Sequence, residues 1–374
     1  MSETQFIFPN YPESILSLSN SFLKHYGVPT DFDTLPLLDK ALSKAPRNIL
    51  FMIFDGMGTA VLEKKLPADS FLRKHIKQTI HSVFPPTTTA ATTTFYSALP
   101  PSAHGWLGWA PFFKEQHTAI ELFLGTDFYT HEKIQDFKVE NVLSYEHIFN
   151  HIKKYSKNVK TTEIFPKNIK ENGVSSLAEM EQRVLSLHQE NGEHFTLCYW
   201  PEPDFTLHRF GVSGDEILPV LNEIDSLLQR LSKELSDTLI VVSADHGLID
   251  VEEVLYIDDY PDAFACLSKP LSLDDRTSAV FLKPDKKEDF LKAFKRHFQN
   301  DFLLLSREEV FKLSLFGSTV FNERAKDFIG DYLIISVKGK TLHQKLPDGS
   351  LPIEFKGSHA GLTPDEIHVP LIII

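Results

Sequence analysis

Three runs of apolar residues are typical of buried β-strands. They read NILFMIF at residues 48–54, FTLCYW at 195–200 and TLIVV at 238–242. β-branched and aromatic residues dominate these runs, and each is shorter than a typical helix. Because the runs do not alternate with polar residues, we expect strands that are covered on both faces. Further strands are predicted near residues 78–84 and in the terminal VPLIII.

Segments between these runs carry apolar residues at helical spacing. Residues 11–27 place Ile15, Leu18 and Phe22 on one stripe, and a helix is predicted from about Gly58 to His75. The segments 144–156 and 215–235 are also amphipathic, and the stretch after Thr88 is helical in pattern. Strands that alternate with helices predict an α/β fold: a doubly wound, mostly parallel central sheet with helices on both faces.

The regular alternation of predicted strands and helices ends after residue 250. RTSAVFLKP at 276–284 and DYLIISVKG at 331–339 predict strands, and KKEDFLKAFKRHF at 286–298 predicts a helix. We interpret residues 251–350 as a smaller inserted α+β cap subdomain. Residues 46–250 and 351–374 would form the catalytic core, and residues 1–45 an N-terminal helical segment packed on that core.

Composition narrows the function classes. Of the 374 residues, 51 are acidic and 38 basic, so the formal net charge is −13. This charge argues against a nucleic-acid polymer as partner. Cys198 and Cys266 form no CxxC pair, and Cys198 is predicted to be a buried thiol. No secretory signal or membrane span is expected from the pattern, which favours a cytoplasmic location without a membrane partner.

Acidic residues and histidines follow the predicted strands. Asp55 ends the first run, Asp245 and His246 end the run at 238–242, and Asp204 with His208 follow the run at 195–200. Open α/β sheets place their ligand sites at the carboxyl ends of the strands. His359 lies in a later Ser-His-Ala-Gly segment. Three carboxylates and three imidazoles are enough for two divalent metal ions, so the pattern predicts a metallohydrolase.

The threonine-rich stretch offers a nucleophile. Pro85 and Pro86 interrupt the preceding strand pattern, so Thr88 would lie at the amino terminus of a helix. The free N–H groups there favour an anion such as a phosphoryl oxygen. A hydroxyl becomes a good nucleophile once a base or a metal ion stabilises its alkoxide.

Each of these residues also has a purely structural interpretation. Asp55 before Gly56 could cap a turn, and the threonines could cap and line a helix. The spacing of Asp204 and His208 arises by chance in many proteins, and a loop histidine such as His359 could form a hydrogen bond with the backbone. Asp245-His246 is the more specific signal, because a polar pair that directly ends a buried strand needs partners.

Taken in chain order, these segments resemble the alkaline phosphatase superfamily, and most closely its nucleotide pyrophosphatase/phosphodiesterase branch. The resemblance spans residues 48–362 and rests on ordered motifs. They are FDGMG with Asp55, SVFPPTT ending at Thr88, PSAHG with His104, the D-x-x-x-H of Asp204 and His208, the D-H-G of Asp245 to Gly247, and His359. The SVFPPTT motif and the spacing back from His104 both indicate Thr88 as the family's nucleophile.

The resemblance implies two metal sites. One ion would be held by Asp204, His208 and His359, and the other by the set Asp55, Asp245, His246 and Thr88. These nitrogen and oxygen ligands suit Zn²⁺, with Mn²⁺ as an alternative. Thr88 would attack phosphorus and form a covalent phospho-threonine, which water then hydrolyses. His104 lies outside this set and is interpreted as structural.

Two departures from the branch leave the substrate open. Diesterases of the branch often carry Asn three residues after the nucleophile, where this chain has Ala91, and Arg where it has Met57. Trp106 and Trp109 could form an aromatic wall for a nucleobase or pack in a core. Arg276 is either an anion contact or a structural arginine.

The predicted function is a two-metal phosphodiesterase or nucleotide pyrophosphatase acting on a small phosphate ester, with a nucleotide as one candidate. A phosphomonoesterase on the same scaffold is the main alternative. A phosphomutase is less favoured, because the long insertion follows Asp245-His246 and not the nucleophile. A non-catalytic phospholigand-binding protein is least favoured, because all the proposed ligands and the hydroxyl are present. The sequence does not indicate an oligomeric state.

Overall fold

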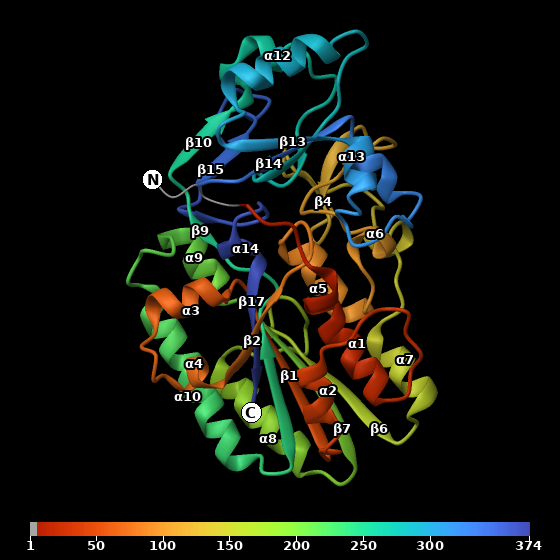
Figure 1. Ribbon diagram of the computed structural model, residues 1–374, viewed down its shortest axis with the longest axis vertical. Helices are drawn as coiled ribbons and strands as arrows, with labels where there is room; N and C mark the ends of the chain where they lie inside the picture. Colours follow the sequence, from red (N-terminus) through yellow and green to blue (C-terminus); the bar gives the residue numbers. More distant parts are fainter. Residues whose placement is uncertain (1–5) are drawn as a thin grey trace.

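The computed structural model describes residues 6–374, so residues 1–5 of the predicted N-terminal segment lie outside the described part. Its centre is a six-stranded sheet with the order β2-β17-β8-β1-β7-β6 (Figure 1). The strands of this sheet are β1 Asn48–Phe54, β2 Ile76–His81, β6 Val159–Ile164, β7 Glu193–Trp200, β8 Thr238–Ser243 and β17 His368–Ile373.

The middle of the sheet is parallel, as predicted. Strand β1 pairs in parallel with β7 on one side and β8 on the other, and β6 continues the parallel order beyond β7. All seven residues of β1 are buried, which explains its unbroken apolar sequence. The exception is β17, which runs antiparallel to both β8 and β2.

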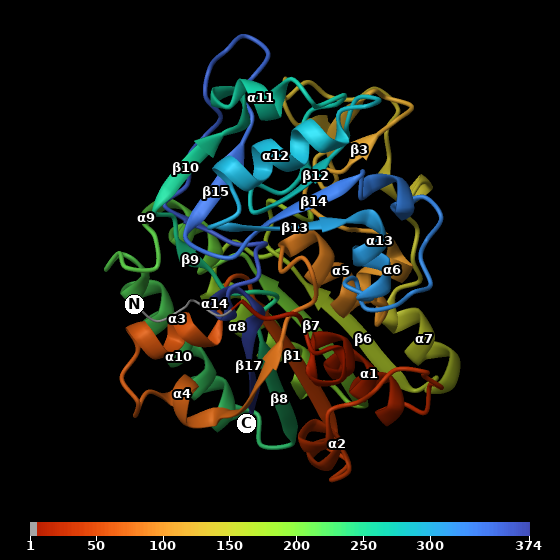
Figure 2. The same ribbon diagram turned by 45° about the horizontal axis from the view of Figure 1, so that its top comes forward.

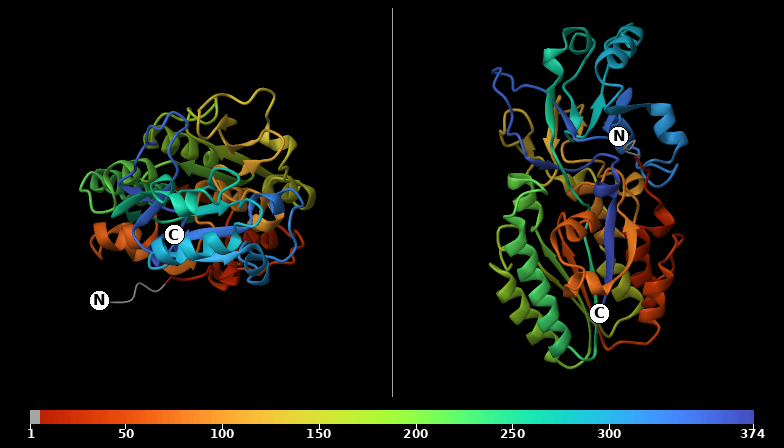
Figure 3. Two further views of the ribbon diagram at one scale, coloured as in Figure 1. Left: turned by 90° about the horizontal axis from the view of Figure 1, so that it is seen from above. Right: turned by 60° about the vertical axis from the view of Figure 1, so that its left-hand side comes forward.

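Helices cover both faces of the sheet, which confirms the predicted architecture (Figure 3). On one face lie α1 Ile15–His25, α2 Pro36–Leu42, α5 Thr88–Ser97 and α7 Ile148–Tyr155. The other helices that pack on this domain are α3 Thr59–Lys65, α4 Phe71–His75, α8 Leu177–Gln189, α9 Asp204–Phe210 and α10 Ile217–Glu234. Within residues 6–374, we find no helix with the length and apolarity required to span a bilayer.

The single helix predicted from about Gly58 to His75 is wrong in one respect. The segment forms two helices, α3 and α4, with Pro67 in the connection. Proline has no N–H for a helical hydrogen bond, and it disfavours helical geometry in the residue before it. The second helix starts afresh at Ser70, whose hydroxyl accepts a hydrogen bond from the Arg73 N–H.

The inserted region lies beyond the carboxyl ends of the parallel strands (Figure 2). It contains the four-stranded antiparallel sheet β11-β12-β14-β13 and a separate parallel pair, β10 and β15. The elements are β10 Glu253–Tyr256, α11 Pro261–Phe264, β11 Ser272–Leu273, β12 Thr277–Val280, α12 Lys287–His297, β13 Phe302–Ser306, α13 Arg307–Lys312, β14 Tyr332–Ser336 and β15 Lys340–His343.

Two short strands join the inserted region to the core. The chain leaves through β9 Ile249–Asp250 and returns through β16 Gly357–Ser358, and these strands pair antiparallel with each other. The short α14 Pro364–Ile367 then leads into β17. The exit and the return of the insertion are therefore one structural unit.

Residues 106–143 pack with the inserted region, although the predicted boundaries place them in the core. Phe113 and Ile120 belong to the same buried hydrophobic cluster as Leu273 and Leu333. α6 Pro101–His104 comes just before this segment, which contains the small sheet β3 Phe112–Phe113, β4 Thr118–Glu121 and β5 Thr126–Asp127. A hydrophobic pattern marks residues as buried but does not say which core buries them.

The packing predicts a large effect of truncating Leu50 in β1. Leu50 is fully buried in the main hydrophobic cluster, so Leu50→Ala should lower the free energy of unfolding by about 3 kcal/mol. Leu291 on α12 is 37% exposed, and Leu291→Ala should change it by about 0.5 kcal/mol or less. Urea unfolding of both variants measures the difference, and equal effects would contradict the assigned core.

Candidate metal and catalytic site

The acidic residues of the site follow three adjacent parallel strands. Asp55 follows β1, Asp204 begins α9 after β7, and Asp245 follows β8. Since β7, β1 and β8 are neighbours and point the same way, their carboxyl ends meet at one edge of the sheet. The predicted convergence of these carboxylates is therefore a direct result of the sheet order.

A first group of ligand atoms consists of Asp55, Asp245 and His246, which lie within 4.8 Å of one another. The Nε2 atom of His246 is 3.3 Å from Asp55 Oδ1 and 3.5 Å from Asp245 Oδ2. Thr88 stands beside this group, with its Oγ1 3.2 Å from the same Nε2 atom. Thr88 is half-buried, whereas its neighbours Thr87 and Thr89 are buried, so Thr88 carries the accessible hydroxyl.

A second group consists of Asp204, His246 and His359. Asp204 Oδ1 is 3.3 Å from His208 Nε2 and 3.9 Å from His359 Nε2. The rings of His246 and His359 are stacked, with centroids 3.7 Å apart. All seven predicted site residues thus form one continuous set of contacts. His246 lies between the two groups, whereas the resemblance assigns it to one site only.

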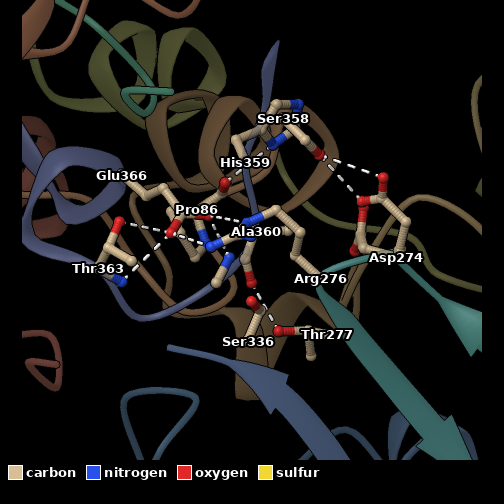
Figure 4. Close-up of polar contacts among 12 residues, drawn as sticks. Pro86, Asp274, Arg276, Thr277, Ser336, Ser358, His359, Ala360, Thr363 and Glu366 are labelled. Atoms are coloured by element: carbon tan, nitrogen blue, oxygen red, sulfur yellow. Dashed lines mark hydrogen bonds and ion pairs between the residues drawn. The ribbon is translucent and has the colours of Figure 1, made fainter. Parts of the chain in front are cut away.

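The three imidazoles are oriented in the same way, by a hydrogen bond to a backbone carbonyl. In each ring Nδ1 faces a backbone carbonyl: Gly357 O for His208 at 2.8 Å, Gly247 O for His246 at 3.1 Å, and Pro86 O for His359 at 3.0 Å (Figure 4 for His359). A carbonyl only accepts, so Nδ1 carries the proton and donates it. The lone pair of a neutral ring is then on Nε2, which faces the carboxylates. Metal-binding histidines characteristically donate their other N–H in this way.

Within residues 6–374, no lysine or arginine forms an ion pair with the buried carboxylates, which contact imidazoles and one another. Burial, followed by the repulsion of Asp245 and Asp204, raises the pKa of Asp55 well above its ordinary value. Burial also raises the pKa values of Asp204 and Asp245 to about 6. One oxygen of each carboxylate makes no conventional hydrogen bond within residues 6–374: Asp55 Oδ1, Asp204 Oδ1 and Asp245 Oδ2. These residues fit divalent cations, which would supply both the missing charge and the missing partner.

Several contacts of the site were not predicted from the sequence. The Tyr199 hydroxyl donates a hydrogen bond to Asp55 Oδ2. Asp245 Oδ1 accepts from the N–H groups of Gly56 and His246, at 3.1 and 3.0 Å. Tyr199 is the penultimate residue of β7 and pairs with Ile53 of β1, near the ends of both strands. Only this register could have indicated the contact between Tyr199 and Asp55. The register cannot be used without knowing that β1 and β7 are neighbours, and the sequence alone does not give the strand order.

Other candidate residues have structural contacts. His104 is fully buried, its Nε2 is 3.1 Å from Thr94 Oγ1, and burial lowers its pKa to about 3. Trp106 is buried and donates from Nε1 to the Leu143 carbonyl, so it packs in a core. Cys198 is fully buried, as predicted. Arg276 is also fully buried and forms an ion pair with Glu366.

The pKa shifts predict how metal binding depends on pH. With pKa values of about 6, Asp204 and Asp245 keep much of their protonation at pH values between about 4 and 6, and a bound ion must displace these protons. Burial lowers the pKa of His246 to about 3 and that of His359 well below its ordinary value, so these two imidazoles release none in that range. Zinc affinity should therefore rise as the pH rises through about 6.

Isothermal titration calorimetry in buffers of different ionisation enthalpy measures this proton release. More protons should be released per zinc ion at a pH of about 5 than at about 8. Equal release at the two pH values would contradict protonated carboxyls in the metal-free protein.

Comparisons with known proteins agree with this geometry. Residues 49–345 match the family described as type I phosphodiesterase / nucleotide pyrophosphatase. None of the curated proteins matches the chain in sequence. Murine ectonucleotide pyrophosphatase / phosphodiesterase 5 has a similar structure, with a TM-score of 0.62, 16% identity and 87% of each chain covered. An inactive variant of that murine protein, solved in complex with AMP, gives the same values.

A bacterial enzyme has a similar fold as well. Phosphonoacetate hydrolase from Sinorhizobium meliloti 1021, in complex with phosphonoformate, has a TM-score of 0.64 and 19% identity, covering 88% of this chain and 90% of that one. At these identities the likeness shows the fold alone. The family match is different, because it covers most of the chain. The chain therefore belongs to the type I phosphodiesterase / nucleotide pyrophosphatase family of metal-dependent phosphoric ester hydrolases.

Proposed function

We propose that the protein is a two-metal phosphodiesterase or nucleotide pyrophosphatase that uses Thr88 as its nucleophile. The observation that carries the proposal is the orientation of three imidazoles by backbone carbonyls, with Nε2 directed at buried carboxylates beside an accessible hydroxyl. Histidines that bind metal ions almost always donate their other ring N–H to such a partner, and here three neighbouring histidines do so together.

The residues that would hold the ions form two sets. Asp204, His208 and His359 would hold one ion, and Asp55, Asp245, His246 and Thr88 the other. Zn²⁺ suits these nitrogen and oxygen donors, and Mn²⁺ is the alternative. When bound, the ions supply positive charge that lowers the pKa of the Thr88 hydroxyl and stabilises the charge that develops at phosphorus.

The protein's own groups position the nucleophile. Thr88 opens the ten-residue helix α5, so free N–H groups of its first turn are available to a phosphoryl oxygen. Attack of Thr88 Oγ1 on phosphorus breaks the bond to the leaving group and forms a phospho-threonine, which water then hydrolyses. His246 lies 3.2 Å from this hydroxyl, but its pKa of about 3 makes it a weak base. Bound ions would therefore be needed to lower the pKa of the Thr88 hydroxyl enough for it to lose its proton to solvent.

The substrate would be a small phosphate ester, with a nucleotide as one candidate. The accessible side of the site contains Thr88, His208 and His359, each partly exposed, while His246 and Asp245 are fully buried. Phe355 is 43% exposed, and its ring centroid is 4.5 Å from that of His208. This ring offers an apolar surface to an aromatic leaving group beside the His208 end of the site.

Replacement of Thr88 tests the nucleophile. Thr88→Ala should lower kcat by roughly 10³-fold or more, because no hydroxyl remains to form the covalent intermediate. Zinc should still bind, since Asp55, Asp245 and His246 remain in the first group. Thr88→Ser keeps the hydroxyl and is the matched control, with activity expected within about tenfold of the parent. Full activity in Thr88→Ala would exclude Thr88 as the nucleophile.

The preference for diesters over monoesters decides the substrate class. Ala91, where branch members often carry an amide, is fully buried in the main cluster and cannot hydrogen-bond a phosphoryl oxygen through its side chain. We expect zinc-loaded protein to hydrolyse bis-p-nitrophenyl phosphate with the higher kcat/KM, compared with p-nitrophenyl phosphate. A higher value for the monoester would favour the phosphomonoesterase and would make the missing amide significant.

A further inference from the structure

A short turn of the inserted region reaches the loops of the catalytic site. Asp274, Asp275 and Arg276 connect β11 to β12, and Thr277 is the first residue of β12. We propose that this turn is a positioning element that fixes the loops bearing Thr88 and His359 relative to each other. The proposal rests on the proposed function for its kinetic part, and on the metal-ligand residues alone for the rest.

Asp274 holds the residue before the nucleophile. Its Oδ1 accepts a hydrogen bond from Thr87 Oγ1 at 3.0 Å, and its Oδ2 accepts from the Trp109 N–H at 3.2 Å. Thr87 is the N-cap residue of α5, yet its side chain makes no capping hydrogen bond. A threonine at this position normally uses its hydroxyl to cap its own helix. Here the hydroxyl is directed at the inserted region, so the helix start is tied to Asp274.

Asp275 holds the residue before the metal-ligand candidate His359. Both of its carboxylate oxygens lie within hydrogen-bond distance of Ser358 Oγ, at 3.1 and 3.2 Å. His343 Nε2 lies 3.4 Å from the same carboxylate. His359 in turn donates from Nδ1 to the Pro86 carbonyl, next to Thr87 (Figure 4). Two consecutive carboxylates therefore fix two loops that also bind each other.

Arg276 and Thr277 hold the segment that follows His359. Arg276 makes a two-pronged pair with Glu366, with both hydrogen bonds at 2.7 Å (Figure 4). Thr277 Oγ1 donates to the Ala360 carbonyl at 2.6 Å. Arg276 and Glu366 are both fully buried, so removal of either would leave an uncompensated charge. Replacing either residue of this pair would destabilise the fold, whereas the hydroxyls of Thr87 and Ser358 can be removed at a smaller cost in stability.

These contacts favour a positioning role over substrate binding. All four oxygens of Asp274 and Asp275 have a hydroxyl, a backbone N–H or an imidazole nitrogen of the protein within 3.4 Å. They are engaged with the loops, and a carboxylate facing a phosphate ester would repel it. Small displacements of a nucleophile or a ligand change rates and affinities strongly. The turn therefore acts through Thr88 and His359.

Removing the hydroxyls of Thr87 and Ser358 one at a time separates the effect of the turn on the nucleophile from its effect on metal binding. Thr87→Val keeps the shape of the buried side chain, and we expect kcat to fall about 10- to 100-fold with zinc affinity unchanged. Thr87→Ser restores the hydroxyl and should recover most of kcat. Ser358→Ala should raise the zinc Kd about 10- to 100-fold, measured by competition with a chelator. Thr34→Val is the control, since it removes a 2.8 Å hydroxyl–carboxylate bond to Asp39 outside the site.

The outcomes distinguish the proposal from a simple loss of stability. Thermal unfolding is measured for every variant, and KM should stay within about threefold of the parent in Thr87→Val. Unchanged kcat in Thr87→Val together with unchanged zinc Kd in Ser358→Ala would overturn the proposal. So would equal losses in Thr34→Val. If the parent hydrolyses no phosphate ester, the proposed function fails, and the zinc Kd of Ser358→Ala alone then decides the role of the turn.

Discussion

The order of three parallel strands places three carboxylates together beside imidazoles, and no lysine or arginine of residues 6–374 forms an ion pair with them. Asp55, Asp204 and Asp245 are buried, and an oxygen of each lacks a conventional hydrogen bond within the described residues. Burial of unpaired charge is costly, and here it appears as raised pKa values. The fold tolerates this cost because strand ends are rigid and fixed by the sheet. Cations bound between the carboxylates would stabilise their charged form.

The imidazoles complete the site by a different route. Their Nδ1 atoms are held by the backbone carbonyls of Gly357, Gly247 and Pro86, so each ring presents Nε2 without help from another side chain. Backbone carbonyls are positioned by the loops themselves. The geometry of the ligands therefore depends on loop conformation, whereas the geometry of the carboxylates depends on the sheet. This division explains why the loops need external support.

The residues placed by the ends of strands could be predicted from the sequence, but few of the positions and contacts that depend on loop conformation could. Asp55 and Asp245 were identifiable because each ends an apolar run, and a parallel sheet requires those ends to meet. The break at Pro67 was missed because the apolar spacing continues on both sides of it. The position of His246 between the two groups of ligand atoms could not be predicted, because it depends on how the loop after β8 directs this side chain. Nor could the packing of residues 106–143, because burial does not identify the core.

The insertion and the candidate metal site are also coupled by chain connectivity. The insertion returns to the core through β16, and His359 follows that strand directly. Ile249 of β9 pairs with Ser358, so the exit and return strands meet beside His359. A shift of the insertion as a rigid body would move this junction, and with it Nε2 of His359 and the Pro86 carbonyl that orients it. The buried Arg276–Glu366 pair opposes such a shift, because separating the pair would leave two charges without partners. The inserted region is thus part of the structure that sets the site's geometry, in addition to any contact it makes with a substrate.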